Sequence, residues 1–156
     1  MDEVTLVNVP AQQVLGMRRR GHYTMIPELL MTIITHAMKN GIAIAGPPVF
    51  LCHETSAEAV KAANEAGTAD VEVAWPVAGA VKGAGEIRAY TLTGGRMARI
   101  LHRGPYEACE STYLRLFTWI GEQGLQITGP IREIYLNDPS EVPPEQILTE
   151  ILAPVG

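Results

Sequence analysis

The clearest fold signal in this chain is the stretch GLQITGPIREIYLNDP, residues 124–139. Its glycines and prolines predict a turn, then a short strand over residues 131–136, then a stop at the final Asn-Asp-Pro. Glu133 and Tyr135 are two residues apart, so an extended strand points both side chains to one face. A carboxylate beside a phenol in mid-strand is the best candidate for chemistry in this chain.

The composition is that of an ordinary globular domain. The chain has 156 residues, 47% hydrophobic and 19% charged, so residues 1–156 are expected to form a single domain with a substantial core. A formal net charge of -5 argues against a nucleic-acid-binding surface. No apolar run approaches the ~18 residues of a membrane helix, and the amino terminus lacks signal-peptide features, which predicts a cytoplasmic protein.

Cysteines and histidines give no sign of a metal or cofactor site. Cys52 and Cys109 lie far apart, and the four histidines lack metal-ligand spacing. Unpaired cysteines fit a reducing compartment. We therefore expect neither a metal nor a cofactor.

The chain contains an internal repeat. Shifting the sequence by 83 positions aligns turn residues without a gap, and a shift of 78 aligns the ends of the two copies. The aligned pairs are Arg20-Gly21 with Arg103-Gly104, Tyr23 with Tyr106, Gly46-Pro47 with Gly129-Pro130, Glu72 with Glu150, and Pro76-Val77 with Pro154-Val155. Most of the aligned residues are of types, such as glycine and proline, that turns and element ends require for their backbone geometry. The match therefore indicates two copies of one unit, about residues 1–78 and 86–156.

Each copy is predicted to run strand, turn, strand, helix, strand, connection, strand. In the second copy, Thr93-Gly94-Gly95 predicts a tight hairpin, and Gly104-Pro105 and Gly124 bound a helix. In the first copy, the connection carries an extra helix that begins at Ser56 and stops at Gly67. The predicted strands are 4–9, 14–18, 71–75, 86–92, 96–102, 131–136 and 147–151, together with a strand that carries Val49 and Leu51. The predicted helices are about 24–40, 56–66 and about 105–123.

These elements predict an α+β fold in which antiparallel sheets carry helices on one face. Apolar alternation places Leu51 beneath the first long helix and Ile134 beneath the second. The opposite strand faces then carry Phe50 in one copy and Glu133 with Tyr135 in the other. If the duplicated strand-helix-strand-strand units pair about a pseudo-twofold axis, those faces enclose a ligand cleft between the repeats.

Four short motifs in the second copy resemble one known family. HRGPYE (102–107), GPIREIYLNDP (129–139), EVPPEQ (141–146) and TEILAPV (149–155) closely resemble GyrI-like (gyrase-inhibitor-like) effector-binding domains, the ligand domains of AraC-type and MerR-type multidrug regulators. The resemblance covers essentially the whole chain and implies the duplicated architecture with an interior cleft. It also implies that Glu133 is the pocket glutamate that, flanked by aromatic rings, binds lipophilic cations. No segment is left over for DNA binding, so the role in transcription regulation does not carry over to this chain, and direct contact with nucleic acid is not expected.

The predicted site combines a carboxylate with aromatic rings. A partly buried carboxylate attracts a cation strongly because the effective dielectric falls, and ring faces add roughly 0.5 to 2 kcal/mol. For Trp119, core packing within the helix is the alternative interpretation, and Tyr106 is equally suited to fasten its helix to the sheet. The expected ligand-binding residues are Glu133, Tyr135, Tyr106, Trp119, Phe50 and Trp75.

Three functions follow from these residues and the resemblance. The leading one is a stand-alone small-molecule-binding protein for hydrophobic, cationic or aromatic compounds. The second, which the resemblance implies, is a hydrolase of strained electrophilic compounds such as those containing cyclopropane, with Glu133 as general acid/base and Tyr135 as hydrogen-bond donor. The third is a protein-interaction inhibitor of the DNA gyrase type, with a topoisomerase or a regulator as its partner.

Overall fold

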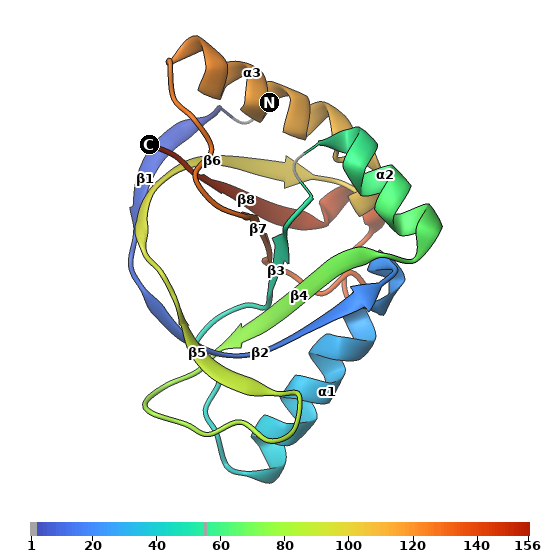
Figure 1. The fold of residues 1–156 in the computed structure, drawn as a ribbon, viewed down its shortest axis with the longest axis vertical. Helices are drawn as coiled ribbons and strands as arrows, with labels where there is room; N and C mark the ends of the chain where they lie inside the picture. Colours follow the sequence, from blue (N-terminus) through green and yellow to red (C-terminus); the bar gives the residue numbers. More distant parts are fainter. Residues whose placement is uncertain (1–2, 55) are drawn as a thin grey trace. The chain divides into compact units, whose positions relative to one another are not determined.

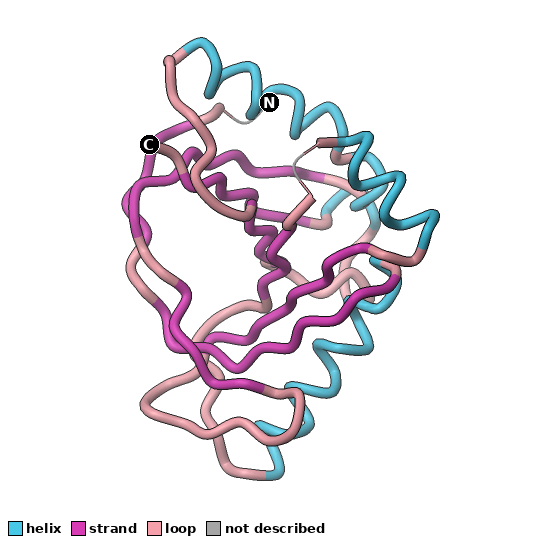
Figure 2. The backbone as a smooth tube through the Cα atoms, viewed as in Figure 1, coloured by secondary structure: helices cyan, strands magenta, loops and turns pink. Residues whose placement is uncertain are grey.

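A computed structural model describes residues 3–54 and 56–156 of the chain, which form two compact units. Unit 1 combines residues 3–9 with Gly95–Gly156, and unit 2 is Pro10–Gly94. Each unit holds antiparallel strands together with helices (Figures 1 and 2). The predicted α+β class is therefore confirmed.

Unit 2 is a four-stranded antiparallel sheet with two helices. Its elements are β2 Gln12–Gly21, α1 Ile26–Lys39, β3 Val49–Cys52, α2 Ala57–Ala66, β4 Ala69–Pro76 and β5 Arg88–Leu92. The strands lie in the order β3-β4-β2-β5, and α1 packs against β4. On β4, Trp75 donates its indole N–H to the Leu30 carbonyl of α1 at 3.0 Å, which marks the face that α1 covers.

Unit 1 repeats this plan with one long helix. Its elements are β1 Thr5–Val9, β6 Gly95–Arg103, α3 Glu110–Glu122, β7 Ile131–Tyr135 and β8 Leu148–Pro154. The strands lie in the order β7-β8-β6-β1, and α3 packs against β6. His102 on β6 lies 2.8 Å from the Thr112 hydroxyl of α3, which marks the face that α3 covers. Short 3-10 turns occur in this unit at Tyr106–Ala108 and Pro144–Gln146, and in unit 2 at Tyr23–Met25.

The two units match in strand order and in register. β3, β4, β2 and β5 correspond to β7, β8, β6 and β1 in turn. The cross-strand pairs obey the shifts of 83 and 78 positions that the sequence shows. Matching pairs are Phe50–Val73 with Glu133–Ile151, and Cys52–Val71 with Tyr135–Thr149. The duplication is therefore confirmed, and each unit can serve as an internal reference for the other.

The hairpin predicted at Thr93-Gly94-Gly95 is wrong. β5 pairs with β2, and the two edges of β6 are taken by β1 and β8. The strand before this turn therefore belongs to unit 2 and the strand after it to unit 1, and β1 and β2 divide between the units in the same way. A glycine turn permits a hairpin, but the partner of a strand depends on sheet edges that are distant in the sequence.

Helix ends follow the local signals. Gly67 and Gly124 have φ values of 69° and 70°, the left-handed conformation that glycine adopts most easily, and they follow α2 and α3 as predicted. The predicted cap of α2 is also present, since Ser56 Oγ accepts a hydrogen bond from the Ala59 N–H at 3.0 Å. Among the described residues, no helix combines the length and the apolar character needed to cross a membrane.

The predicted faces of β7 are wrong. Glu133 accepts a hydrogen bond from Tyr113 of α3, so the side of β7 that faces the helix carries Glu133 and Tyr135 rather than Ile134. The candidate carboxylate therefore lies between the sheet and its own helix. Alternation places two residues on one face, but it does not say which face the helix covers.

The same inversion occurs in unit 2. Phe50 is in register with Val73, which shares a face of β4 with Trp75, the residue that contacts α1. Val49, Phe50 and Leu51 are only 2%, 4% and 4% exposed, so β3 is covered on both faces. A strand buried on both faces reads as a continuous apolar run, which is why the pattern did not reveal its orientation.

Candidate functional site

Glu133 is the centre of the candidate site. It lies on β7 beneath α3, and its side chain is half-buried. The Tyr113 hydroxyl donates to Oε2, and the Tyr135 hydroxyl donates to Oε1 at 3.3 Å. Because Tyr113 comes from α3 and Tyr135 from β7, the carboxylate is held by both layers of the unit.

Aromatic rings line the surroundings of this carboxylate. The rings of Tyr106 and Tyr135 meet edge-on with their centroids 5.3 Å apart. Phe117 of α3 lies 5.8 Å from Tyr113 between ring centroids. The structure therefore brings Glu133, Tyr135 and Tyr106 together, as the sequence predicted, and places Tyr113 among them.

Burial is the main influence on ionisation at this site. It raises the pKa of Glu133 above the ordinary value, while the hydrogen bonds from Tyr113 and Tyr135 act in the opposite direction. Burial and then the Glu133 charge raise the pKa of Tyr135 well above its usual range, and they raise the pKa of the Cys109 thiol to about 11. Near neutral pH, Tyr135 is thus a hydrogen-bond donor, and the thiol is too poorly ionised to act as a nucleophile.

The fold itself does not require an acid at this position. The equivalent residue in unit 2 is Phe50, a core side chain whose ring meets Tyr23 edge-on at 5.8 Å. Tyr113 likewise stands where unit 2 has Leu30. Burying a carboxylate where the duplicate unit buries a phenyl ring opposes folding, so the acid is best explained by function.

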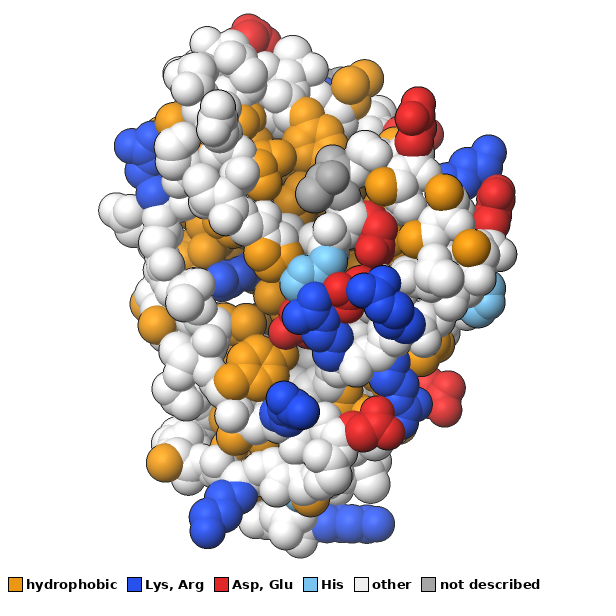
Figure 3. All heavy atoms as spheres, viewed as in Figure 1, with side chains coloured by type: hydrophobic (Ala, Val, Ile, Leu, Met, Phe, Trp, Pro, Cys, Tyr) orange, Lys and Arg blue, Asp and Glu red, His pale blue; other side chains and the backbone are white. Residues whose placement is uncertain are grey.

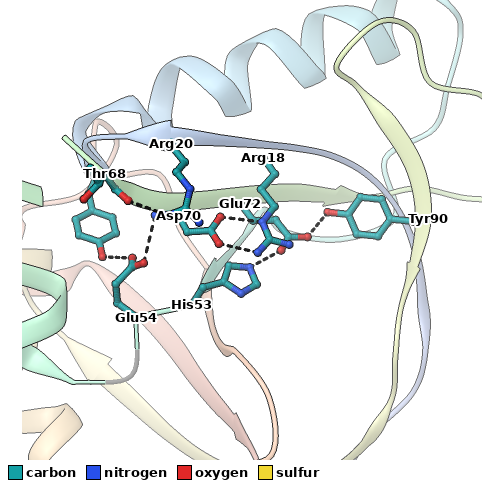
Figure 4. A network of polar contacts seen from close by, with 9 residues as sticks. Arg18, Arg20, His53, Glu54, Thr68, Asp70, Glu72 and Tyr90 are labelled. Atoms are coloured by element: carbon teal, nitrogen blue, oxygen red, sulfur yellow. Dashed lines mark hydrogen bonds and ion pairs between the residues drawn. The ribbon is translucent and has the colours of Figure 1, made fainter. Parts of the chain in front are cut away.

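The buried acids of unit 2 have a different environment because basic side chains pair with them. Asp70 accepts two hydrogen bonds from Arg18, at 2.8 and 2.6 Å. Glu72 lies 2.6 Å from the His53 ring and accepts a hydrogen bond from a tyrosine hydroxyl at 2.7 Å (Figure 4). Figure 3 shows basic and acidic side chains interleaved over the region of β2 and β4. By contrast, the groups that hydrogen-bond to Glu133 are neutral phenols.

A second phenol and carboxylate pair, in unit 2, supports the scaffold. Tyr23 donates to Glu54, and the Asp70 N–H donates to the other Glu54 oxygen at 3.3 Å. The equivalent contact in unit 1 runs from the Leu148 N–H to Asn137 Oδ1 at 3.0 Å. Because each unit uses this side chain to hold the start of its closing strand, Glu54 is a structural residue.

Two of the remaining predicted site residues, Phe50 and Trp75, make contacts that hold unit 2 together. Phe50 packs against a tyrosine ring, and Trp75 hydrogen-bonds to α1, both within unit 2. Trp119 is half-buried on α3. Tyr113 falls at an apolar position of its helix by three- and four-residue spacing, so periodicity alone does not reveal its contact with Glu133. The signal that identifies it is the replacement of Leu30 by a tyrosine between the two copies.

Sequence comparison places the chain in a family. Residues 2–155 match the family described as the GyrI-like small molecule binding domain. No functionally curated protein matches the chain significantly in sequence.

Several solved structures share the fold. The C-terminal domain of EcmrR has a TM-score of 0.87 at 22% identity, covering 100% of this chain and 98% of that one. In the complex of EcmrR with DNA, this chain spans 57% of the EcmrR chain. A hydrolase encoded by lin2189 from Listeria innocua has a TM-score of 0.71 at 14% identity, covering 99% and 92% of the two chains. SAV2435, solved bound to tetraphenylphosphonium, has a TM-score of 0.60 at 12% identity, covering 99% and 94%.

Proposed function

Because the chain belongs to the GyrI-like family of small molecule binding domains, we propose that it binds bulky aromatic cations at Glu133. The observation that carries this proposal is a half-buried carboxylate, held by two neutral phenols, at a position where the duplicate unit has a core phenylalanine. A cationic ligand supplies the positive charge that the side chains bound to this carboxylate do not provide.

Electrostatics and hydrophobic contact together define the ligand class. Two unit charges about 4 Å apart attract by ~1 kcal/mol in bulk water and by ~4 kcal/mol at the effective dielectric near a protein surface. Aromatic faces such as those of Tyr106 and Tyr135 add roughly 0.5 to 2 kcal/mol. Hydrophobic contact has no preferred direction, so the site selects strongly for charge and weakly for shape.

One structural neighbour supports this ligand class. SAV2435 shares the fold and was solved with tetraphenylphosphonium, a cation that carries four aromatic rings. Its identity of 12% limits the likeness to the fold. The proposal for this chain therefore depends on the surroundings of its own Glu133.

Two probes of the same shape and opposite charge test the proposal. Titration calorimetry with tetraphenylphosphonium is expected to show binding, whereas the tetraphenylborate anion is expected to bind at least tenfold more weakly, a difference of about 1.4 kcal/mol. The reason is that both probes offer the same apolar contact while only the cation is attracted by the carboxylate. Equal affinity for the two ions would refute a charge-selective site at Glu133.

A second candidate function is hydrolysis of strained electrophiles. The observation that favours it is the carboxylate with a raised pKa and a phenol donor beside it, the combination that general acid/base chemistry uses. Glu133 would remove a proton from water as the water oxygen attacks an activated cyclopropane carbon. The ring bond would break, and its electron pair would be protonated by the acid form of Glu133. The hydrolase from Listeria innocua shares the fold.

Turnover distinguishes this second candidate from simple binding. Product release from an activated cyclopropane compound, followed by chromatography, is expected to exceed one equivalent of protein if the site is catalytic. Tyr135→Phe is then expected to lower kcat by roughly tenfold to a hundredfold, because the donor hydroxyl is lost while the ring is retained. Product that never exceeds one equivalent would leave only the binding function.

A further inference from the structure

Thr149 on β8 carries a buried hydroxyl that makes no hydrogen bond within the part of the chain that the structure describes. The residue is 3% exposed, and its Oγ1 has no partner. Buried hydroxyls are normally hydrogen-bonded, because a polar group removed from water without a partner lowers the stability of the folded state. Such a hydroxyl is open to a partner from outside the chain, either an ordered water or a polar group of a ligand.

Thr149 belongs to the same surface as Glu133. It is in register with Tyr135 on β7 and with His102 on β6, so the three side chains form one row on the side that α3 covers. Directly paired residues have their Cβ atoms about 5 Å apart. Thr149 therefore borders Tyr135, whose hydroxyl donates to Glu133.

The neighbouring polar side chains in this row, His102 and Tyr135, already have hydrogen-bond partners. His102 Nε2 lies 2.9 Å from the Pro105 carbonyl, which can only accept a hydrogen bond, so this nitrogen carries a proton and donates it there. His102 Nδ1 lies 2.8 Å from the Thr112 hydroxyl. On the other side, the Tyr135 hydroxyl is directed to Glu133. Thr149 is left beside the site with its hydrogen-bonding capacity unused.

The duplicate unit shows that the fold does not need this hydroxyl. The equivalent of Thr149 is Val71, which is 0% exposed and occupies the same register position. Valine has nearly the shape of threonine, with a methyl group in place of the hydroxyl. The sheet therefore requires only a side chain of this volume at the position. Unit 1 therefore carries polar groups at two neighbouring positions, Glu133 and Thr149, where unit 2 has Phe50 and Val71.

We propose that the Thr149 hydroxyl is a second anchor of the ligand site and accepts a hydrogen bond from the N–H of a protonated amine whose charge is held by Glu133. This inference rests on the proposed function and extends its ligand class to bulky aromatic ammonium ions that carry N–H groups. A quaternary cation uses Glu133 and the rings, whereas a protonated amine also uses Thr149. A site with a buried polar group favours ligands that satisfy it over analogues that leave it unpaired.

Two ligands on one skeleton test the inference. The first is 3,3-diphenylpropylammonium, which has N–H donors, and the second is its N,N,N-trimethyl derivative, which has none. In titration calorimetry at neutral pH, Thr149→Val is expected to weaken binding of the first about fivefold and to change binding of the second less than twofold. Thr149→Ser keeps a hydroxyl and is expected to retain most of the preference for the N–H ligand.

Thermal unfolding without ligand supplies an independent readout. Thr149→Val is expected to raise Tm, because an unpaired buried hydroxyl is replaced by the residue that the duplicate unit uses. A fall in Tm, or equal weakening of both ligands, would show that the hydroxyl serves the fold or the packing and would overturn the inference while leaving the proposed function intact. If neither ligand binds the wild-type protein, the proposed function fails, and this inference fails with it.

Discussion

Replacing Glu133 by glutamine is expected to weaken the binding of tetraphenylphosphonium at least tenfold, about 1.4 kcal/mol. Glutamine has the same length, and its carbonyl oxygen accepts from one of the two phenols that hold the carboxylate, Tyr113 and Tyr135, while its amide group donates to the oxygen of the other. What it removes is the negative charge. Titration calorimetry measures the change, and unchanged affinity would remove Glu133 from the site.

A matched variant controls for the overall charge of the protein. Glu122→Gln makes the same substitution on an exposed side chain in the last turn of α3. Because an exposed charge is screened by salt, this variant is expected to bind within about twofold of the wild type. A comparable loss in both variants would indicate a non-specific attraction by the net charge of the protein.

Glu133→Gln is also expected to stabilise the folded protein at neutral pH. Burial raises the pKa of Glu133 above its ordinary value of 4.5, so the folded protein holds this proton more tightly than the unfolded chain does. The stabilisation of the folded state by this proton is complete when the pH is below the ordinary pKa of 4.5. It is lost as the pH rises through the raised pKa of the folded protein. Glutamine does not titrate. The Tm of Glu133→Gln minus that of the wild type is therefore expected to grow across this window and then level off.

Truncating Leu116 to alanine is expected to cost about 2 to 5 kcal/mol in the free energy of unfolding, the largest stability effect that we predict. Leu116 is 0% exposed on the side of α3 that packs against the sheet, and α3 meets β6 there. The cavity left by the substitution also loosens the helix that carries Tyr113. Urea denaturation measures the loss, and a lower affinity for the cation is expected to accompany it.

Leu114 provides the control on the same helix. It is 66% exposed, so Leu114→Ala removes the same atoms without opening a cavity and is expected to change the unfolding free energy by less than about 0.5 kcal/mol. A similarly small effect of Leu116→Ala would mean that burial of this helix face does not hold α3 to the sheet.

The positions of helices, strands and helix ends were largely predictable from the sequence. Ser56 caps α2 and Gly124 follows α3 because caps and left-handed stops are decided by a few neighbouring residues. The shifts of 83 and 78 positions also predicted which residues of the two units are equivalent. Local backbone geometry was sufficient for each of these inferences.

The surroundings of Glu133 were only partly predictable. Its neighbour Tyr135 lies two residues away on the same strand, and strand periodicity alone placed the two side chains on one face. Tyr113 and Thr149 come from α3 and β8, and their positions relative to Glu133 depend on how those elements pack. Comparison of the two copies offers a signal for both, since tyrosine replaces Leu30 and threonine replaces Val71.

By itself the sequence determined the secondary structure, the duplication and the pairing of an acid with a phenol on one strand, because these depend on short-range backbone preferences and on periodicity. Only the tertiary structure decided that β5 joins β2 instead of β6, and that Glu133 faces α3. The physical reason is that strand partners and covered faces are selected by the burial of apolar surface between segments that are distant in the chain. An alternating pattern on one strand shows that two faces differ, but it does not show what lies against each of them.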